Sequence, residues 1–170
     1  ESRLLWVGRN LLNRHWGTVA ISDGWIETAN GDLSGGEFTL DMIAIECSDL
    51  DASSGGSILI AHLQGDDFFD TERHPEARFR INTARRLDGA AAGESNLRVE
   101  GELTLKGITQ PVSFDAVAGL MEDGKPAAQA TLAIDRTLWN VIYGSGKLFH
   151  RLGGHLVNDL IELQVKIVAA

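Results

Sequence analysis

Histidine and cysteine have the widest chemical range among the side chains of this chain, because both bind metals and transfer protons. The 170 residues include five histidines and a single cysteine, Cys47. No two histidines form a pair such as H-x-H or H-E-x-x-H, and His150 and His155 are too far apart for the usual helical spacing. The sequence therefore predicts no metal site and no cofactor. It predicts a buried, unreactive thiol at Cys47, and a single cysteine excludes an intramolecular disulfide.

Motifs for nucleophilic and phosphate chemistry are incomplete. Residues 144–147, Gly-Ser-Gly-Lys, resemble part of a phosphate-binding loop, but the full motif requires glycine where Val141 stands. The same serine lies outside a G-x-S-x-G nucleophile elbow. His62 with Asp66 is the one pairing that could support acid–base chemistry, and no residue is assigned as catalytic.

Arg136 is a charged residue that the strand pattern places on the apolar side of the sheet. It follows Ile134 by two positions, so on a strand both side chains point to the same apolar side. Asp159 has the same parity between Val157 and Ile161. Because a buried arginine needs an anionic partner, we expect an Arg136–Asp159 ion pair at one end of the fold. Contact between Arg136 and a ligand head group is the alternative.

Apolar and polar residues alternate with a period of two along most of the chain, which predicts half-buried β-strands. The pattern is clearest at 96–106, where leucine and valine face one way and mostly charged residues the other. About eight or nine strands are predicted in this way. The other segments are 4–8, 16–22, 25–29, 37–42, 78–82, 112–118, 132–134 and 157–167.

Asparagine or aspartate before glycine predicts turns at 22–24, 29–32 and 122–125. Two segments have helical character, Ser57–Gln64 and Leu138–Leu152, and Asp51 with its following serines is a candidate cap for the first. Phe68 and Phe69 are expected to tuck beneath the sheet as a structural plug, since two adjacent exposed rings would form a costly apolar patch.

This many strands with short turns must stack as a sandwich or close into a barrel. Charge on nearly every outer face favours one curved sheet around one interior. We therefore predict an all-β fold, a lipocalin-like antiparallel β-barrel of about eight strands with one or two short helices. The 170 residues suit a single domain over residues 1–170.

Inward parity selects the residues that are predicted to line a ligand-binding interior. Small residues among them predict unfilled volume near Ala116 and Ala118, because close-packed interiors leave few voids. The predicted lining residues are Trp6, Phe38, Met42, Phe114, Ala116, Ala118, Leu132, Ile134, Arg136, Ile161, Leu163 and Val165.

Composition narrows the range of partners. The formal net charge is −9, which opposes binding to nucleic acids and to anionic membrane surfaces. No apolar run reaches the roughly 18 residues of a transmembrane segment. A homodimer is compatible with the sequence.

Several motifs resemble those of the YceI family of lipid-binding proteins. His62-Leu63 with Asp67-Phe68-Phe69-Asp70, followed by Pro75, Ala77 and Phe79, resembles the family signature HL...DFFD....P.A.F. Residues 101–114, GELTLKGITQPVSF, are similar to its G.LTLKGIT.PV.F strand pair. Further similarity is found in Gly35-Gly36 with Phe38 and Asp41-Met42, in Asp135-Arg136, and in Trp6-Val7-Gly8 with His15-Trp16-Gly17-Thr18-Val19.

The resemblance implies an elongated lipocalin-like barrel that binds a polyisoprenoid chain, such as a polyprenyl or quinone-type lipid, in an apolar tunnel. It implies non-enzymatic storage or transport and a periplasmic or secreted location, and it transfers no catalytic residue. Two alternatives are a hydrolase or isomerase acting on a lipophilic substrate, and a ligand-free interaction module. The module requires an interior filled by side chains.

Overall fold

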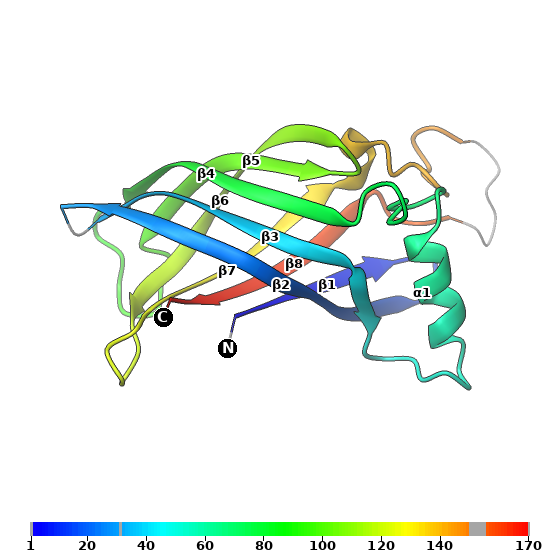
Figure 1. Cartoon of the computed structure of the whole chain (residues 1–170), viewed down its shortest axis with the longest axis horizontal. Helices are drawn as coiled ribbons and strands as arrows, with labels where there is room; N and C mark the ends of the chain where they lie inside the picture. Colours follow the sequence, from blue (N-terminus) through cyan, green and yellow to red (C-terminus); the bar gives the residue numbers. More distant parts are fainter. Residues whose placement is uncertain (1, 31, 150–155, 170) are drawn as a thin grey trace.

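Eight antiparallel strands close into a barrel in which each strand pairs with its neighbours in sequence and β8 returns to β1 (Figure 1). The structure is a computed structural model and describes residues 2–30, 32–149 and 156–169. Within these residues, one α-helix and one 3₁₀ helix accompany the strands, which confirms the predicted lipocalin-like barrel. The elements are β1 (Arg3–Arg9), β2 (Arg14–Ala29), β3 (Asp32–Cys47), α1 (Gly56–Gln64), β4 (Glu76–Arg86), β5 (Leu97–Leu105), β6 (Ile108–Leu120), β7 (Pro126–Asp135), η1 (Arg136–Trp139) and β8 (Leu160–Val168).

Strand β1 closes the barrel, because it pairs with β2 on one side and with β8 on the other. Trp6, for example, lies opposite Gly17 of β2 and opposite Leu163 of β8. Pairing on both sides leaves β1 without a free edge, so its backbone hydrogen-bonding groups have partners within the sheet.

The predicted alternation is observed most clearly in β5. Its odd-numbered residues are buried, and its even-numbered residues are exposed or half-buried. A two-residue turn at Lys106 and Gly107, both at positive φ, joins β5 to β6. The predicted turn at 122–125 joins β6 to β7, with Gly124 at φ 84°. Tight turns of this kind fix the register of the strands that they connect.

The turn predicted at residues 22–24 is wrong, because β2 continues through it from Arg14 to Ala29. Asp23 lies at a register shift in the pairing with β3. Gly24 serves packing there: a Cβ at this position would lie 2.5 Å from Cδ1 of Phe38. The glycine therefore makes room for an aromatic ring.

The second predicted helix, Leu138–Leu152, is also wrong over its described part. A short 3₁₀ helix, η1, spans Arg136–Trp139, and the side chain of Asp135 accepts a hydrogen bond from the Thr137 N–H at its start. Asn140, at φ 57°, ends it, and Gly144 has φ 63°. Two left-handed residues so close together are incompatible with a continuous α-helix. Residues 150–152 lie outside the described residues.

Helix α1 confirms the predicted helix at Ser57–Gln64 and lies across one end of the barrel (Figure 1). Its predicted cap is wrong: the N-cap residue is Gly55, and no side chain caps it. Asp51 instead stabilises the preceding turn, where its carboxylate accepts the Ser54 N–H at 2.7 Å. The helix depends on packing rather than on a cap, and Leu63 is its buried contact with the core.

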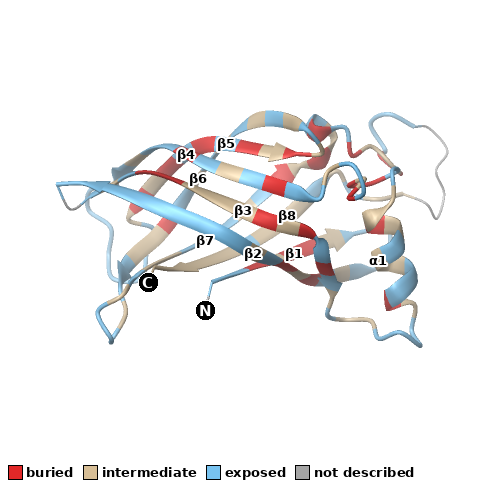
Figure 2. Ribbon diagram, in the orientation of Figure 1, coloured by how far each residue is buried: buried red, intermediate tan, exposed pale blue. Residues whose placement is uncertain are grey.

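The larger group of buried side chains forms a core in the half of the barrel next to α1, whereas the far half of β2 is exposed (Figure 2). A second, smaller buried group consists of Ile81, Leu97, Val99 and Ala116. Phe68 and Phe69 belong to the core next to α1, with 6% and 8% of their surfaces exposed. The prediction that at least one of these rings tucks under the barrel is confirmed for both. The loop after α1 thus supplies side chains that help to close this end.

Candidate functional site

A cavity of about 890 Å³ runs through the barrel interior and receives side chains from all eight strands and from α1. Most of its lining residues are aliphatic or aromatic. The volume lies toward the upper end of the range for small-molecule binding sites, which is roughly 300–1,000 Å³. A cavity of this size contradicts the filled interior that a ligand-free module would require.

The structure brings together every lining residue that was predicted by inward parity. All twelve border the cavity: Trp6, Phe38, Met42, Phe114, Ala116, Ala118, Leu132, Ile134, Arg136, Ile161, Leu163 and Val165. Their contact with a ligand stays a prediction, whereas their position in the wall is a property of the fold.

Other lining residues were missed. Leu40, Val99 and Leu103 share the period-two pattern of the predicted ones, so the same signal could have found them. Leu59 and Leu63 come from α1, and no strand parity applies to a helix.

Aromatic rings from β3, β4 and β6 form part of the wall, and β5 lies between the last two strands. Phe79 and Phe114 have ring centroids 5.6 Å apart, and Phe38 lies opposite Phe79 in the β3–β4 pairing. Gly101 makes this arrangement feasible, since a Cβ there would lie 2.8 Å from Cζ of Phe79 and would overlap the Arg80 carbonyl oxygen. Phe79 also packs against the core next to α1 and against the smaller buried group that contains Ile81 and Val99.

At the α1 end, His62 lies among aromatic rings. Its ring makes edge contacts with Phe68 and Tyr143, at centroid distances of 4.9 and 4.5 Å. The proposed pairing of His62 with Asp66 is wrong, because no hydrogen bond or ion pair joins the two residues. Asp66 is exposed, and its backbone carbonyl accepts a hydrogen bond from Lys106. The one acid–base pairing suggested by the sequence is therefore not formed.

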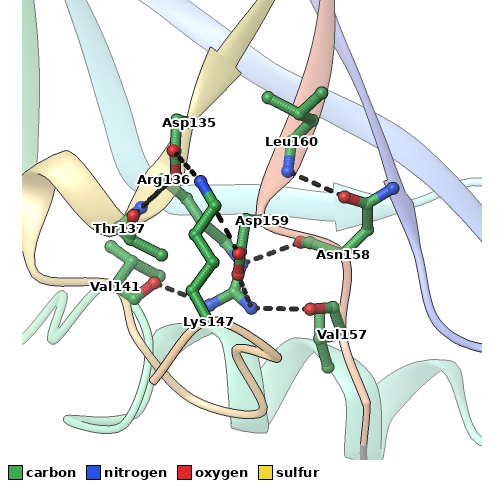
Figure 3. Close-up of polar contacts among 9 residues, drawn as sticks. All are labelled: Asp135, Arg136, Thr137, Val141, Lys147, Val157, Asn158, Asp159 and Leu160. Atoms are coloured by element: carbon green, nitrogen blue, oxygen red, sulfur yellow. Dashed lines mark hydrogen bonds and ion pairs between the residues drawn. The ribbon is translucent and has the colours of Figure 1, made fainter. Parts of the chain in front are cut away.

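Arg136 is fully buried and holds together the chain segments at this end (Figure 3). Its guanidinium donates to the carbonyl oxygens of Val141 at 2.6 Å, Val157 at 3.0 Å and Asn158 at 3.0 Å. The predicted pair with Asp159 is present, with Nη2 3.6 Å from Oδ1. Both residues lie outside the strands on which the parity argument placed them, because Arg136 begins η1 and Asp159 precedes β8.

The charges around Arg136 balance locally. Lys147 donates to Asp135 at 2.5 Å, and its Nζ lies 3.8 Å from Oδ2 of Asp159. Burial lowers the pKa of the Arg136 guanidinium, and the charges of Asp159 and Asp135 oppose that shift. Most of the guanidinium donors are directed at protein carbonyls, which favours the structural role of Arg136 over contact with a ligand head group.

A second polar cluster joins β2 to the loop after β3. Asp49 accepts hydrogen bonds from the Trp16 N–H at 2.9 Å and from the Cys47 thiol at 3.3 Å, and its other oxygen lies 2.8 Å from Nδ1 of His15. Burial opposes ionisation of Asp49, but these hydrogen bonds lower its pKa below the usual value. The carboxylate therefore acts as a fixed acceptor that ties the two segments together.

Cys47 is half-buried rather than buried as predicted. Burial raises the pKa of its thiol, and the adjacent Asp49 carboxylate adds to that increase. Because the thiolate is the reactive form, both effects reduce its nucleophilicity at neutral pH.

No three histidine, cysteine, aspartate or glutamate side chains in residues 2–30, 32–149 and 156–169 are grouped so that they could hold a metal ion. His150 and His155 lie outside the described residues. In the described part of the chain, no helix has the length and apolar character needed to cross a membrane.

Comparison with known proteins identifies a matching family and relatives that are similar in sequence. The family model of the YceI-like domain matches residues 2–169. A UPF0312 protein of Pseudomonas putida is 42% identical over 55 residues, which are 32% of this chain and 26% of the relative. Protein YceI of Escherichia coli is 38% identical over 55 residues, with the same two shares. These matches therefore span about a quarter of the length of the curated relatives.

Solved structures share the fold over most of the chain. BcnA of Burkholderia cenocepacia superposes with a TM-score of 0.75 at 20% identity, and the match covers 99% of this chain and 96% of that one. A polyisoprenoid binding domain from Saccharophagus degradans superposes with a TM-score of 0.70 at 16% identity, covering 97% and 91%. At these identities the likeness establishes a common architecture.

Proposed function

Because the chain belongs to the YceI-like domain family, we propose that it binds a long apolar isoprenoid lipid, of polyprenyl or quinone type, in the barrel cavity. The observation that carries the proposal is the cavity itself, about 890 Å³ in volume and lined by apolar side chains from every strand. The polyisoprenoid binding domain of Saccharophagus degradans, which has the same fold, supports this choice of ligand.

The physical basis of binding is burial of apolar surface. Each Å² of apolar surface removed from water contributes about 25 cal/mol, so a long hydrocarbon chain can bind tightly with few polar contacts. The ordering of a flexible chain opposes this gain. Side chains such as Leu163, Val165 and Ile134 give the lipid an apolar surface to contact.

The role that we propose is storage or transport, without chemical change of the lipid. The wall supports this, since His62 lacks an acid–base partner in Asp66 and Arg136 is bonded to backbone carbonyls. A periplasmic or secreted location is part of the same proposal.

The test is solvent extraction of freshly purified protein followed by mass spectrometry, with the protein quantified in the same sample. We expect an isoprenoid at near-equimolar yield and no phospholipid at comparable yield. A mock purification from host cells without the expressed chain controls for lipid carried through the columns. Protein that yields no isoprenoid, and that fails to take up added polyprenol after delipidation, would overturn the proposal.

A further inference from the structure

Strands β6 and β7 are joined by backbone pairing over only a small part of their length. They have 13 and 10 residues, but only four residue pairs link them, from Val117 with Gln129 to Leu120 with Pro126. Nine pairs link β6 to β5, and nine link β7 to β8. Residues 111–116 of β6 and 130–134 of β7 therefore run past each other without a ladder, and we call this stretch the β6–β7 seam.

The sequence of β6 accounts for part of this gap. Met121 donates its N–H to the Lys125 carbonyl at the hairpin, so by alternation the odd-numbered residues of β6 direct their backbone groups toward β7. In the seam these residues include Pro111, which has no N–H to donate, and Asp115, whose carboxylate is bound to Arg98 of β5 at 2.9 Å. Pro111 therefore limits backbone pairing locally at one end of the seam, while the rest of the gap follows from the register of the two strands.

Both sides of the seam belong to the cavity wall. Val112, Phe114 and Ala116 of β6 and Ala130, Leu132 and Ile134 of β7 all border the cavity. Between these two strand segments, no ladder of backbone hydrogen bonds closes the wall. Parting them would open the cavity sideways without breaking a ladder.

The seam is tied at both ends. The β6–β7 hairpin holds one end, away from α1 (Figure 1). At the other end, Gln110 donates to the Leu138 carbonyl at 3.1 Å, and the buried Trp139 donates to the Leu103 carbonyl at 2.9 Å. These contacts make the seam a slot of limited length, so opening it does not require β7 to leave the barrel.

The two ends of the barrel are less suited to an apolar chain. At the α1 end, Leu63, Phe68 and Phe69 are buried in the core. At the opposite end, the exposed ion pair of Arg86 with Asp32, 2.5 Å apart, stands at the border of the cavity. An apolar chain threaded end-on would pass beside these charges, with Leu120, Pro126 and Ile167 also at the border of the cavity there.

We propose that the β6–β7 seam is a lateral portal through which the apolar ligand enters and leaves the cavity. This inference rests on the proposed function, because it concerns the path to the same cavity. It assigns to Pro111 a role in keeping the seam free of backbone pairing.

The test is a reversible cross-link. In the register of the β6–β7 ladder, Asp115 and Thr131 lie opposite each other two positions beyond the Val117–Gln129 pair, and both side chains are exposed. The variant D115C/T131C, with Cys47→Ser, is joined by a short bismaleimide that contains a reducible disulfide. The matched control is T131C/Q164C, likewise with Cys47→Ser, which places the same cross-link across the paired strands β7 and β8.

Both variants are loaded with a fluorescent farnesol, and its transfer to excess phosphatidylcholine vesicles is timed. We expect the seam cross-link to slow transfer about tenfold or more, reduction to restore the rate, and the control cross-link to leave it within about twofold. An equal rate before and after reduction in the seam variant would overturn the portal and indicate exchange through an end of the barrel. If the uncross-linked variants and the unaltered protein never retain the probe, the proposed function fails instead.

Discussion

Arg136 and Asp159 lie 3.6 Å apart between Nη2 and Oδ1, yet the guanidinium makes shorter contacts, of 2.6 to 3.0 Å, with three backbone carbonyls. The ion pair is therefore secondary to a set of hydrogen bonds that joins η1, the following loop and the segment before β8. The carboxylate balances a buried charge, while the carbonyls hold the chain in place.

Because the carbonyl hydrogen bonds are stronger constraints than the ion pair, substitutions at Asp159 and Arg136 should lower the unfolding free energy by different amounts. Asp159→Asn retains the shape of the side chain and leaves the three carbonyl bonds intact, so we expect a loss of about 1–2 kcal/mol in unfolding free energy. Arg136→Met leaves those carbonyls without their donor and Asp159 without its nearest cation, and we expect a loss of about 3–5 kcal/mol. Urea denaturation measures both. A larger loss for Asp159→Asn would show that the ion pair is the stronger constraint.

Ala116→Trp distinguishes a ligand cavity from a solid core. In a close-packed interior the larger side chain would cost about 1–3 kcal/mol or more, because it forces neighbouring groups apart. In the cavity the indole can occupy ligand space, so we expect a folded protein with little change in Tm and no bound lipid. Thermal unfolding and lipid extraction are measured on one preparation.

The matched control for that substitution is Glu102→Trp, which adds the same ring to the exposed face of β5. It should retain both Tm and lipid. An Ala116→Trp protein that unfolds easily but keeps its lipid would show that this part of β6 does not face the ligand.

Phe68→Ala tests the aromatic plug beside α1. The ring is 6% exposed, contacts His62 and Tyr143, and lies 5.7 Å from the Arg136 guanidinium carbon. Truncation of a buried phenylalanine costs about 3–5 kcal/mol, and we expect a loss in that range. Phe149→Ala, at a site that is 44% exposed, should change stability by no more than about 0.5 kcal/mol. Similar effects of the two substitutions would contradict the plug.

Asp49 should contribute to the pH dependence of stability. Its pKa in the folded protein lies below the unfolded value, which is about 3.9, so folding favours the ionised carboxylate. Its contribution is complete well above pH 4 and is lost as the pH falls through the unfolded and then the folded pKa. Asp49→Asn removes this titration.

The measurement is unfolding free energy for the unaltered protein and for Asp49→Asn between about pH 7 and pH 3. We expect the difference between them to be largest near neutrality and to shrink in acid. Asp135, whose pKa is also lowered, leaves a residual acid sensitivity in both proteins. A difference that is constant with pH would mean that the Asp49 charge does not stabilise the fold.

Strand content and wall positions could be predicted from the sequence because the period of two is a local property. The alternation in β5 places Leu97, Val99 and Leu103 on one face, and the structure buries all three. The same rule placed Ala116 and Leu132 in the wall. Charge on the outer faces then favoured a barrel over a sandwich, and the family motifs around Phe68 and Gly101 implied the kind of ligand.

Features that depend on partners distant in sequence were not predictable. Gly24 follows an aspartate, as in a hairpin turn, but its role is to accept the Phe38 ring of the neighbouring strand. The carbonyl partners of Arg136 come from loops whose course no periodicity describes. The shortness of the β6–β7 ladder likewise follows from register, although Pro111 gives a local hint.

The pairing of β1 with β8 also bears on how the chain folds. Every other pairing joins strands that are consecutive in sequence and can form as hairpins or after the closure of one loop, whereas β1 and β8 are the first and last strands. Bringing them together carries the largest loop-closure entropy of any strand pair, so we expect it to form late. Until then the sheet is an open intermediate with two free edges and an exposed apolar face, the state in which the chain is most prone to aggregate. A lipid that bridges the inner faces of β1 and β8 would favour closure, and would thereby act as a template for folding as well as a cargo.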